Sequence, residues 1–366
     1  MVIKLKIRKS LLTVIILIIL TLTSCSKIEN KNDVVINLFD MQRANNIAKD
    51  YLNNIISGDF NAASNLLSED LLKSNNNISE GVSKIISIKS DESIEGNNYG
   101  YFIYNIVRSS EVEPKSDLEN ITFKVKKQNN EYKIDEIKSK SEKEIYTNGT
   151  GLRVIGEDGG KSSLIVTLNN LPKDAYLRDN KIMLYKDIVP KDEFGKVCLS
   201  FTGKRIAITT TNNKDSYICI AYIDEALMAS AQPGGQSGGS GANIDTSNID
   251  TLEDVLEKPI AQKIVDVDLL KDSKIDKLVF SEKEDLLQVT YNNKYNKDRI
   301  RIYKGDDGSL VQTELDSMFP EDKYNLTNGK FDEEVFKFKV TTFEGEEDEL
   351  SGEYILDLRN LEINKL

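Results

Sequence analysis

The chain has 366 residues, of which 39% are hydrophobic and 30% charged, a composition that allows several folded domains and excludes wholesale disorder. Asp and Glu number 60 against 48 Lys and Arg, and this excess of negative charge makes nucleic acid an unsuitable partner, because phosphate backbones are bound mainly by Lys and Arg. The sequence contains no histidine, which excludes Ser-His-Asp and Cys-His nucleophile pairs, an imidazole base and His-ligated metal; carboxylate, Lys and Tyr chemistry remains open.

Residues 1–24 have the three-part pattern of an export signal. Residues 1–10 are basic, residues 11–22 form an apolar run, and Leu22, Thr23 and Ser24 lead to Cys25. The apolar run is shorter than the ~20 residues that span a bilayer. The pattern resembles the bacterial lipobox, Leu–small–small–Cys. This resemblance implies cleavage after Ser24 and a lipid, including palmitate-type acyl chains, on Cys25.

Residues 25–37 are mainly polar and are expected to form a tether between the lipid and the first domain. An uncleaved membrane anchor and an ordinary signal peptide are the alternatives to the lipobox, and each of the three exports the chain. We therefore expect a lipid-anchored protein on the extracytoplasmic face of the cell membrane.

Residues 39–57 carry apolar side chains at steps of three and four, which predicts a helix. Asp40 can cap its start and Gly58 can end it in a left-handed conformation. A second short helix is expected after Asp59, and a third over residues 80–88. From Tyr99 onward the period changes to two, and the expected strands are residues 101–108, 120–127 and 131–137.

Residues 48–72, together with the strands that end at residues 129–137, resemble the nuclear transport factor 2-like (cystatin-like cone) domain of many bacterial lipoproteins. In that family a long helix and a shorter one pack in the mouth of a curved antiparallel sheet. Tyr132, Lys133 and Ile134 stand where the family often has Trp-Lys-Ile. The resemblance implies an α+β domain over residues 38–142. It favours a binding or spacer role, because the chain lacks the histidine of the enzymatic members.

The tyrosine-rich strand of this domain has two interpretations. Tyr99, Tyr101 and Tyr104 could line an apolar ligand cavity inside the cone, or they could form its packed core and sheet face.

The rest of the chain is predicted to be mostly β. Residues 150–226 alternate short strand patterns with turn signals, as in a small β-sandwich. Residues 227–258 combine a Gly/Ser-rich linker with a short helix, and residues 259–366 are again β-rich. The expected fold class is therefore α+β, with a cone domain followed by two small mostly-β domains.

Two segments of these β regions resemble each other. Residues 198–225 and 277–308 both run strand, tight turn, strand, Asn-rich loop, strand, and a weaker third copy lies over residues 335–363. Such repeats are also typical of propeller blades, so partial propeller-like blades are the alternative to two small domains.

Few residues are candidates for chemistry. Cys198 and Cys219 lie within predicted strands and could form a disulfide, with buried free thiols as the alternative. A G-x-S-x-G match at residues 235–239 lies in the linker and lacks a histidine base. No catalytic set, metal or cofactor is predicted.

The sequence therefore indicates a membrane-anchored, non-enzymatic binding protein with a protein or cell-wall partner. A lipoprotein that holds a small apolar or lipid-like ligand in the cone is the first alternative. An enzyme that uses carboxylates or tyrosine is the second.

Overall fold

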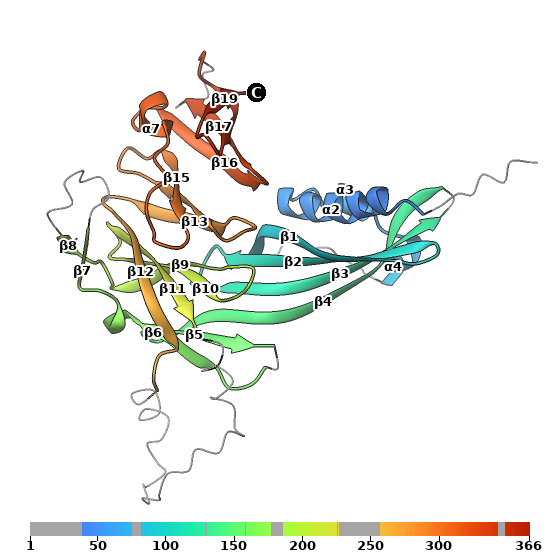
Figure 1. Cartoon of the computed structure of the whole chain (residues 1–366), viewed down its shortest axis with the longest axis horizontal. Helices are drawn as coiled ribbons and strands as arrows, with labels where there is room; N and C mark the ends of the chain where they lie inside the picture. The colour runs from blue at the N-terminus through green and yellow to red at the C-terminus, as the bar shows by residue number, and fades with distance from the viewer. Residues whose placement is uncertain are drawn as a thin grey trace, which may run out of the picture. The chain divides into compact units, whose positions relative to one another are not determined.

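The computed structural model describes residues 39–74, 82–128, 130–157, 159–176, 186–224, 226, 257–342 and 348–366. The predicted signal sequence, tether and Gly/Ser-rich linker lie outside these residues. The described part of the chain is mostly β, with several small antiparallel sheets and few helices (Figure 1). Residues 40–366 belong to one compact unit.

Helix α2 (Met41–Ser57) confirms the first predicted helix. The Asp40 carboxylate accepts a hydrogen bond from the backbone N of Arg43 at 3.0 Å, which caps the start. Gly58 ends the helix with a φ of 77°, a left-handed conformation that glycine adopts without a steric penalty. The buried stripe of the helix consists of Ala44, Ala48 and Leu52.

Two short helices follow, α3 (Phe60–Ser64) and α4 (Glu69–Ser74). The carboxylate of Asp59 caps α3, as predicted. The prediction of a third helix over residues 80–88 is wrong. Where the structure describes this segment, it forms strand β1 (Ser83–Glu95). Pairing with β2 (Tyr99–Ser110) gives the backbone of this segment hydrogen-bond partners along its length. A helix of about two turns is only marginally stable by itself.

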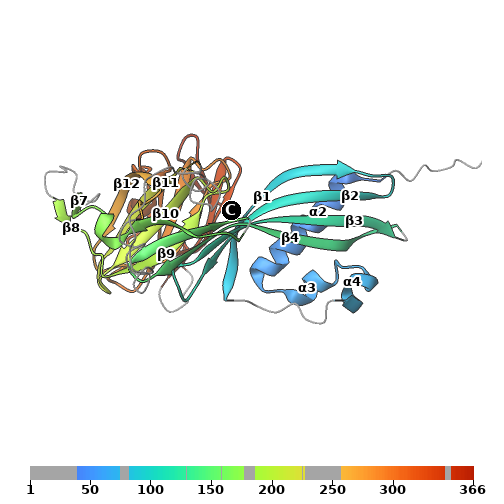
Figure 2. The ribbon, with the colours of Figure 1, turned by 90° about the horizontal axis from the view of Figure 1, so that it is seen from below.

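Six antiparallel strands form the first sheet in the order β1-β2-β3-β4-β5-β6. Helix α2 contacts β1 to β4 and lies across this curved part of the sheet (Figure 2). Strand β4 runs through residues 143–148, where we expected a domain to end, and pairs directly with β5. Beyond β1, the strands are β2 (Tyr99–Ser110), β3 (Ser116–Gln128), β4 (Glu131–Asn148), β5 (Gly151–Gly156) and β6 (Ser163–Thr167).

The helix-facing side of β2 and β3 is apolar. Phe102 and Phe123 lie opposite each other in the strand register, and both are buried. The Tyr51 ring of α2 packs edge-on against Phe123, with ring centroids 5.6 Å apart. The Tyr104 hydroxyl donates to Asn45 Oδ1 at 2.5 Å. Aromatic packing and the hydrogen bond from Tyr104 of β2 to Asn45 thus help to hold α2 on the sheet.

Three further sheets are antiparallel meanders, with the orders β12-β11-β10-β9, β13-β14-β15 and β16-β17-β18-β19. Strand β12 follows the linker yet pairs with β11, so the segments that we expected to form separate domains on either side of the linker share one sheet. The strands are β9 (Glu193–Leu199), β10 (Arg205–Thr211), β11 (Ser216–Ile223), β12 (Ala261–Leu270), β13 (Lys274–Phe280), β14 (Leu286–Asn292), β15 (Asp298–Lys304), β16 (Tyr324–Asp332), β17 (Val335–Thr342), β18 (Gly352–Asp357) and β19 (Ile363–Lys365).

The two repeated segments correspond to β9–β11 and β13–β15, which have the strand, turn and loop order expected from the sequence. A meander of three or four strands is also the arrangement of a propeller blade. The remaining elements are η1 (Leu168–Asn170), β7 (Asp174–Tyr176), β8 (Lys186–Ile188) and α7 (Leu315–Met318).

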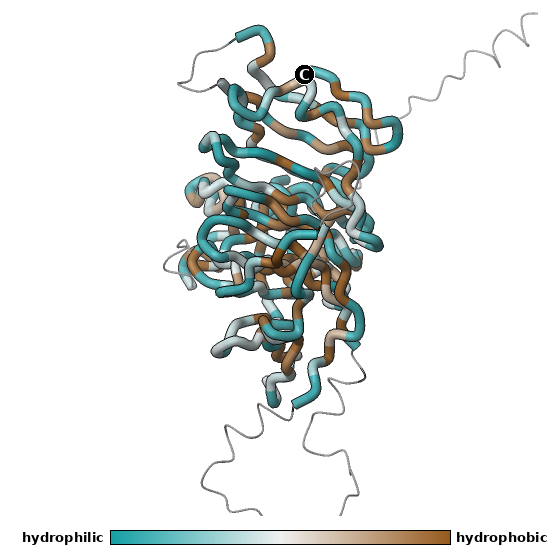
Figure 3. The backbone as a smooth tube through the Cα atoms, turned by 90° about the vertical axis from the view of Figure 1, so that its left-hand side faces the viewer, coloured by the Kyte–Doolittle hydropathy of each residue, from teal (hydrophilic) through white to brown (hydrophobic). Residues whose placement is uncertain are grey.

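The apolar side chains form two cores that join the sheets. Figure 3 marks the hydrophobic stretches of the chain in brown. One core combines residues such as Val154, Ile208 and Leu287, and so joins the end of the first sheet to the next two sheets. A second core joins β15 to the last sheet and includes Phe319 and Phe336.

Charged groups are also buried between these sheets. Asp268 of β12 is 2% exposed, and its Oδ2 accepts hydrogen bonds from Arg301 Nη1 at 3.0 Å and from the Tyr303 hydroxyl at 2.5 Å. Arg299 is fully buried and donates to Asp316 Oδ1 at 2.6 Å. Buried charges of this kind require partners, because desolvation of an isolated ion is costly.

Candidate functional site

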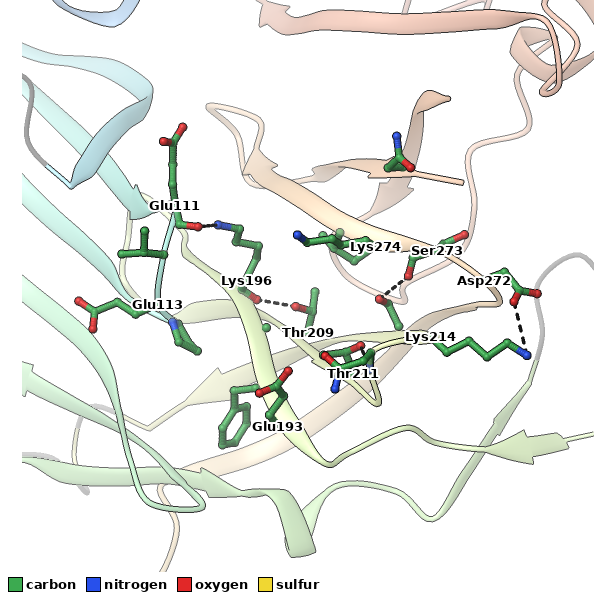
Figure 4. Close-up of a pocket in the computed structure, with 18 of the residues that line it drawn as sticks. Glu111, Glu113, Glu193, Lys196, Thr209, Thr211, Lys214, Asp272, Ser273 and Lys274 are labelled. Atoms are coloured by element: carbon green, nitrogen blue, oxygen red, sulfur yellow. Dashed lines mark hydrogen bonds and ion pairs between the residues drawn. The ribbon is translucent and has the colours of Figure 1, made fainter. Parts of the chain in front are cut away.

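A pocket of about 770 Å³ lies among β9, β10, the start of β13 and the hairpin that joins β2 to β3 (Figure 4). Its lining residues are 111–114, 193–196, 209, 211, 213, 214, 216, 272–275, 292 and 293. Ammonium, carboxylate, amide and hydroxyl groups outnumber apolar side chains in this lining. The volume is that of a site for a small ligand or a short chain segment.

Ser110 fixes the hairpin side of the pocket. Its Oγ accepts hydrogen bonds from the backbone N of Val112 at 3.2 Å and of Glu113 at 3.3 Å, and its backbone N donates to Lys115 O at 3.0 Å. The tight tip leaves the Val112 side chain 79% exposed. An apolar side chain therefore lies in solvent beside a polar pocket.

Lys196 connects β9 to this hairpin. Its Nζ donates to Ser110 O at 3.0 Å and to Glu111 O at 2.7 Å. Burial lowers the pKa of Lys196, and the charge of Lys274 acts in the same direction, while Glu111 and Asp276 oppose both. An ammonium has three donors. Within the described residues one N–H of Lys196 thus remains for a ligand.

Two turns bonded to each other form the opposite side. The Asp215 carboxylate accepts from Lys271 Nζ at 3.1 Å and from the backbone N of Asp272 at 3.0 Å. The backbone N of Ser273 donates to Lys214 O at 3.0 Å, and Lys214 Nζ lies 3.4 Å from Asp272 Oδ1. This side of the pocket is therefore fixed before any ligand binds.

The four hydroxyl groups of the lining all donate to backbone carbonyls. A serine or threonine nucleophile needs a base that accepts its proton, whereas these protons are already directed to amide oxygens. The bonds are Thr209 to Lys196 O at 2.9 Å, Thr211 to Asp215 O at 2.9 Å, Ser216 to Ser273 O at 2.7 Å and Ser273 to Lys271 O at 2.8 Å. The arrangement suits binding rather than attack by a hydroxyl.

Charges of both signs are exposed at the pocket. Glu113 lies on the hairpin, Glu193 on β9 and Lys274 on β13, and all three side chains are exposed. Figure 4 shows Lys274 directed toward Lys196. A ligand that carries a carboxylate, alone or with a cationic group, would find complementary charges here.

The three predicted cavity tyrosines do not line a common cavity. Tyr104 is buried beneath α2, whereas Tyr99 and Tyr101 point to the opposite face of the sheet, because successive residues of a strand alternate. The Lys124 ammonium lies 5.2 Å from the Tyr99 ring centroid and 5.7 Å from that of Tyr101. The tyrosines of β2 thus lie on both faces of the sheet.

Of the two interpretations of the cysteines, the structure has buried free thiols. Cys198 pairs with Ala207 and Cys219 with Ile208, adjacent residues of β10 that point to opposite faces of the sheet. The cysteines are therefore two strands apart, about 10 Å, which is beyond disulfide reach. Burial raises the pKa of both thiols, that of Cys198 to about 12.

The predicted lipidation site, Cys25 with Leu22, Thr23 and Ser24, lies outside the described residues. Within the described ranges, no group of three or more Cys, Asp and Glu side chains is arranged to hold a metal ion. No helix in that part of the chain has the length and apolar character needed to cross a membrane.

Sequence reasoning missed the pocket. Its contributing segments, residues 111–114, 193–196 and 272–275, are each about 80 residues apart, and none carries a motif. The one local signal is the Asn212-Asn213 turn, at which Asn212 Oδ1 accepts from the backbone N of Lys214 and Asp215.

No protein-family model matches the sequence, and no characterised protein matches it. Among solved structures, a puromycin hydrolase S511A mutant shares 8% identity over 73% of this chain and 45% of its own length, with a TM-score of 0.30. A nidogen/laminin complex shares 7% over 71% of this chain and 88% of the other, with a TM-score of 0.28. A Mycobacterium tuberculosis puromycin-hydrolyzing peptidase shares 7% sequence identity over 76% of this chain and 52% of its own length, with a TM-score of 0.20. The chain spans less than half of the puromycin hydrolase, and we therefore argue function from the pocket itself.

Proposed function

We propose that the chain is a lipid-anchored, extracytoplasmic binding protein whose pocket holds a charged, polar partner without transforming it. The proposal rests on the residues that line the pocket. Their hydroxyls donate to backbone carbonyls, and the charged side chains of Lys274, Glu113 and Glu193 are exposed. Groups arranged in this way recognise charge, and none of the four hydroxyls is activated as a nucleophile.

The anchor and the first module complete the proposal. The basic, apolar and small-residue segments before Cys25 support export and lipid attachment. A long helix across a curved antiparallel sheet supports a nuclear transport factor 2-like module in the first part of the chain. That module follows the tether and contributes residues 111–114 to the pocket, whose partner is a protein or a cell-wall component.

The anchor is tested by labelling the producing cells with alkyne-palmitate. We expect the wild-type chain to carry the label and to sediment with membranes, and Cys25→Ala to lose both properties. Cys198→Ala, a change at a buried thiol, should keep the label. Wild-type protein that retains Met1, or that carries no acyl group, contradicts the anchor.

The pocket is tested by calorimetric titration of the full chain in detergent with charged amino acids, short peptides and soluble cell-wall fragments. Lys274→Gln should weaken binding by roughly tenfold, because it removes a charged donor. Lys304→Gln is the matched control, since Lys304 is exposed at the opposite end of the same sheet. Recovery of the unchanged ligand supports binding, whereas pocket-dependent turnover shows an enzyme and contradicts the proposal.

A further inference from the structure

Four consecutive residues of β9, 193–196, line the pocket, together with residues 272–273 of the turn before β13 and residues 274–275 at the start of that strand. Successive side chains of a strand point to opposite faces, so a cavity against a sheet face is lined by every second residue. A run of consecutive residues indicates instead that the cavity follows the edge of the strand. The pocket therefore lies along the edge of β9 and reaches the start of β13.

Both strands are edges of their sheets. Among the described strands, β9 pairs with β10 alone and β13 with β14 alone. An edge strand presents backbone N–H and C=O groups that can pair with an added strand. These edges provide a site for extended backbone, not only for a small molecule.

Side chains from the first sheet already bind the second half of the β9 edge. Ser109 Oγ donates to Val197 O at 3.2 Å, and Ser116 Oγ accepts from the backbone N of Leu199 at 3.1 Å. Two backbone groups of β9 beyond residue 196, Val197 O and Leu199 N, thus have partners within the chain. The part of the edge that faces the pocket is residues 193–196.

Charges of both signs are exposed at the pocket, and its two lysines select one acidic side chain in the segment that fits this edge. The ammonium of Lys196 keeps one N–H donor for a ligand, and the exposed Lys274 is directed toward it (Figure 4). Two neighbouring ammonium groups repel each other, and a carboxylate between them removes that repulsion. At the rim, Val112 offers an exposed apolar contact.

We infer that the partner binds as an extended peptide segment with an acidic side chain, which pairs with β9 at residues 193–196 and places its carboxylate between Lys196 and Lys274. This inference rests on the proposed function, because it names the partner class for the same pocket. Specificity comes from the lysines and affinity from main-chain pairing.

The test uses fluorescence anisotropy of the full chain in detergent with three labelled, capped hexapeptides. The first alternates valine and threonine around one central glutamate, the second replaces glutamate by glutamine, and the third keeps glutamate but is N-methylated at alternate amides. We expect binding of the first, roughly tenfold weaker binding of the second, and loss of binding by the third, which lacks the N–H donors on the side that pairs with β9.

Two variants complete the design. Lys274→Gln should remove the preference for glutamate over glutamine, while Lys304→Gln should leave it unchanged, with thermal unfolding confirming that both variants fold. Equal binding of the N-methylated peptide overturns the edge pairing. Binding of free glutamate but of no peptide, with dependence on Lys274, overturns the peptide inference and leaves the proposed function standing. No binding of any charged probe at the pocket overturns both.

Discussion

The curved sheet with α2 and the sheets that follow it bury different kinds of groups. Beneath α2 the buried side chains are apolar or aromatic, such as Phe102 and Phe123. Between β12 and β15, Asp268, Arg301 and Tyr303 are buried together as a hydrogen-bonded set. The first region is thus held mainly by apolar packing, whereas the second also depends on fixed polar partners. The pocket lies where a hairpin of the first region meets strands of the second.

The largest effect is expected from the buried charges. Asp268→Ala removes the carboxylate that Arg301 and Tyr303 share, and should lower the free energy of unfolding by about 3–4 kcal/mol in chemical denaturation. The double variant Asp268→Leu with Arg301→Met should recover much of the loss, because it removes both charges of this buried pair. A loss below about 1 kcal/mol for Asp268→Ala would show that the set does not stabilise the second region.

The apolar region is tested by Leu52→Ala. Leu52 is 1% exposed at the interface of α2 with the sheet, and its truncation should cost about 2–4 kcal/mol by denaturation. Leu52→Met, which keeps the volume, should cost less than about 1.5 kcal/mol. Equal losses for the two variants would contradict packing as the source of this stability.

Asp117 is an exception within the first region. Burial raises its pKa to about 6 from 3.8, although Lys115 acts in the opposite direction. The folded state then binds the proton more tightly than the unfolded chain does. The resulting contribution to stability is complete below pH ~3.8 and is lost as the pH rises to ~6.

Asp117→Asn should therefore stabilise the protein by about 2 kcal/mol at pH 7.5, and the gain should shrink toward pH 4. Urea denaturation at both pH values measures the difference. If Asp117→Asn destabilises the protein at pH 7.5, the ion pair with Lys115 at 3.8 Å outweighs the burial of the carboxylate.

The smallest effect is expected from Tyr104→Phe. The change removes the hydrogen bond to Asn45 but keeps the ring, so it should cost about 1 kcal/mol in denaturation. A loss as large as that of Leu52→Ala would show that polar bonding, and not apolar packing, holds α2 on the sheet.

The elements defined by local signals could be predicted from the sequence. The cap at Asp40, the stop at Gly58 and the alternation through β2 and β3 depend on neighbouring residues only, and the structure has them close to the expected positions. The region after residue 80 was predicted as helix because its few apolar residues also fit that period, and pairing with β2 decides for a strand.

The buried charges and the order of strands in the sheets could not be predicted, because they depend on contacts between residues far apart in the sequence. Nothing in the local sequence marks Arg299 and Arg301 as buried, because charged side chains are rarely buried without a partner. Asp268, which binds Arg301, precedes it by 33 residues. The pairing of β12 with β11 across the linker, and hence the edge position of β9, follows from sheet order, which local patterns do not contain.

The central claim, that the partner binds at the pocket between the two regions and not at the far end of the first region's sheet, is tested most directly by photo-crosslinking in the producing cells. A benzoylphenylalanine replaces Val112 at the pocket or Ile94 at the far end of the curved sheet, both of which are exposed. We predict one defined adduct from position 112 that disappears with Lys274→Gln, and none from position 94. An adduct from position 94 alone, or one from position 112 that is indifferent to Lys274, would contradict the account.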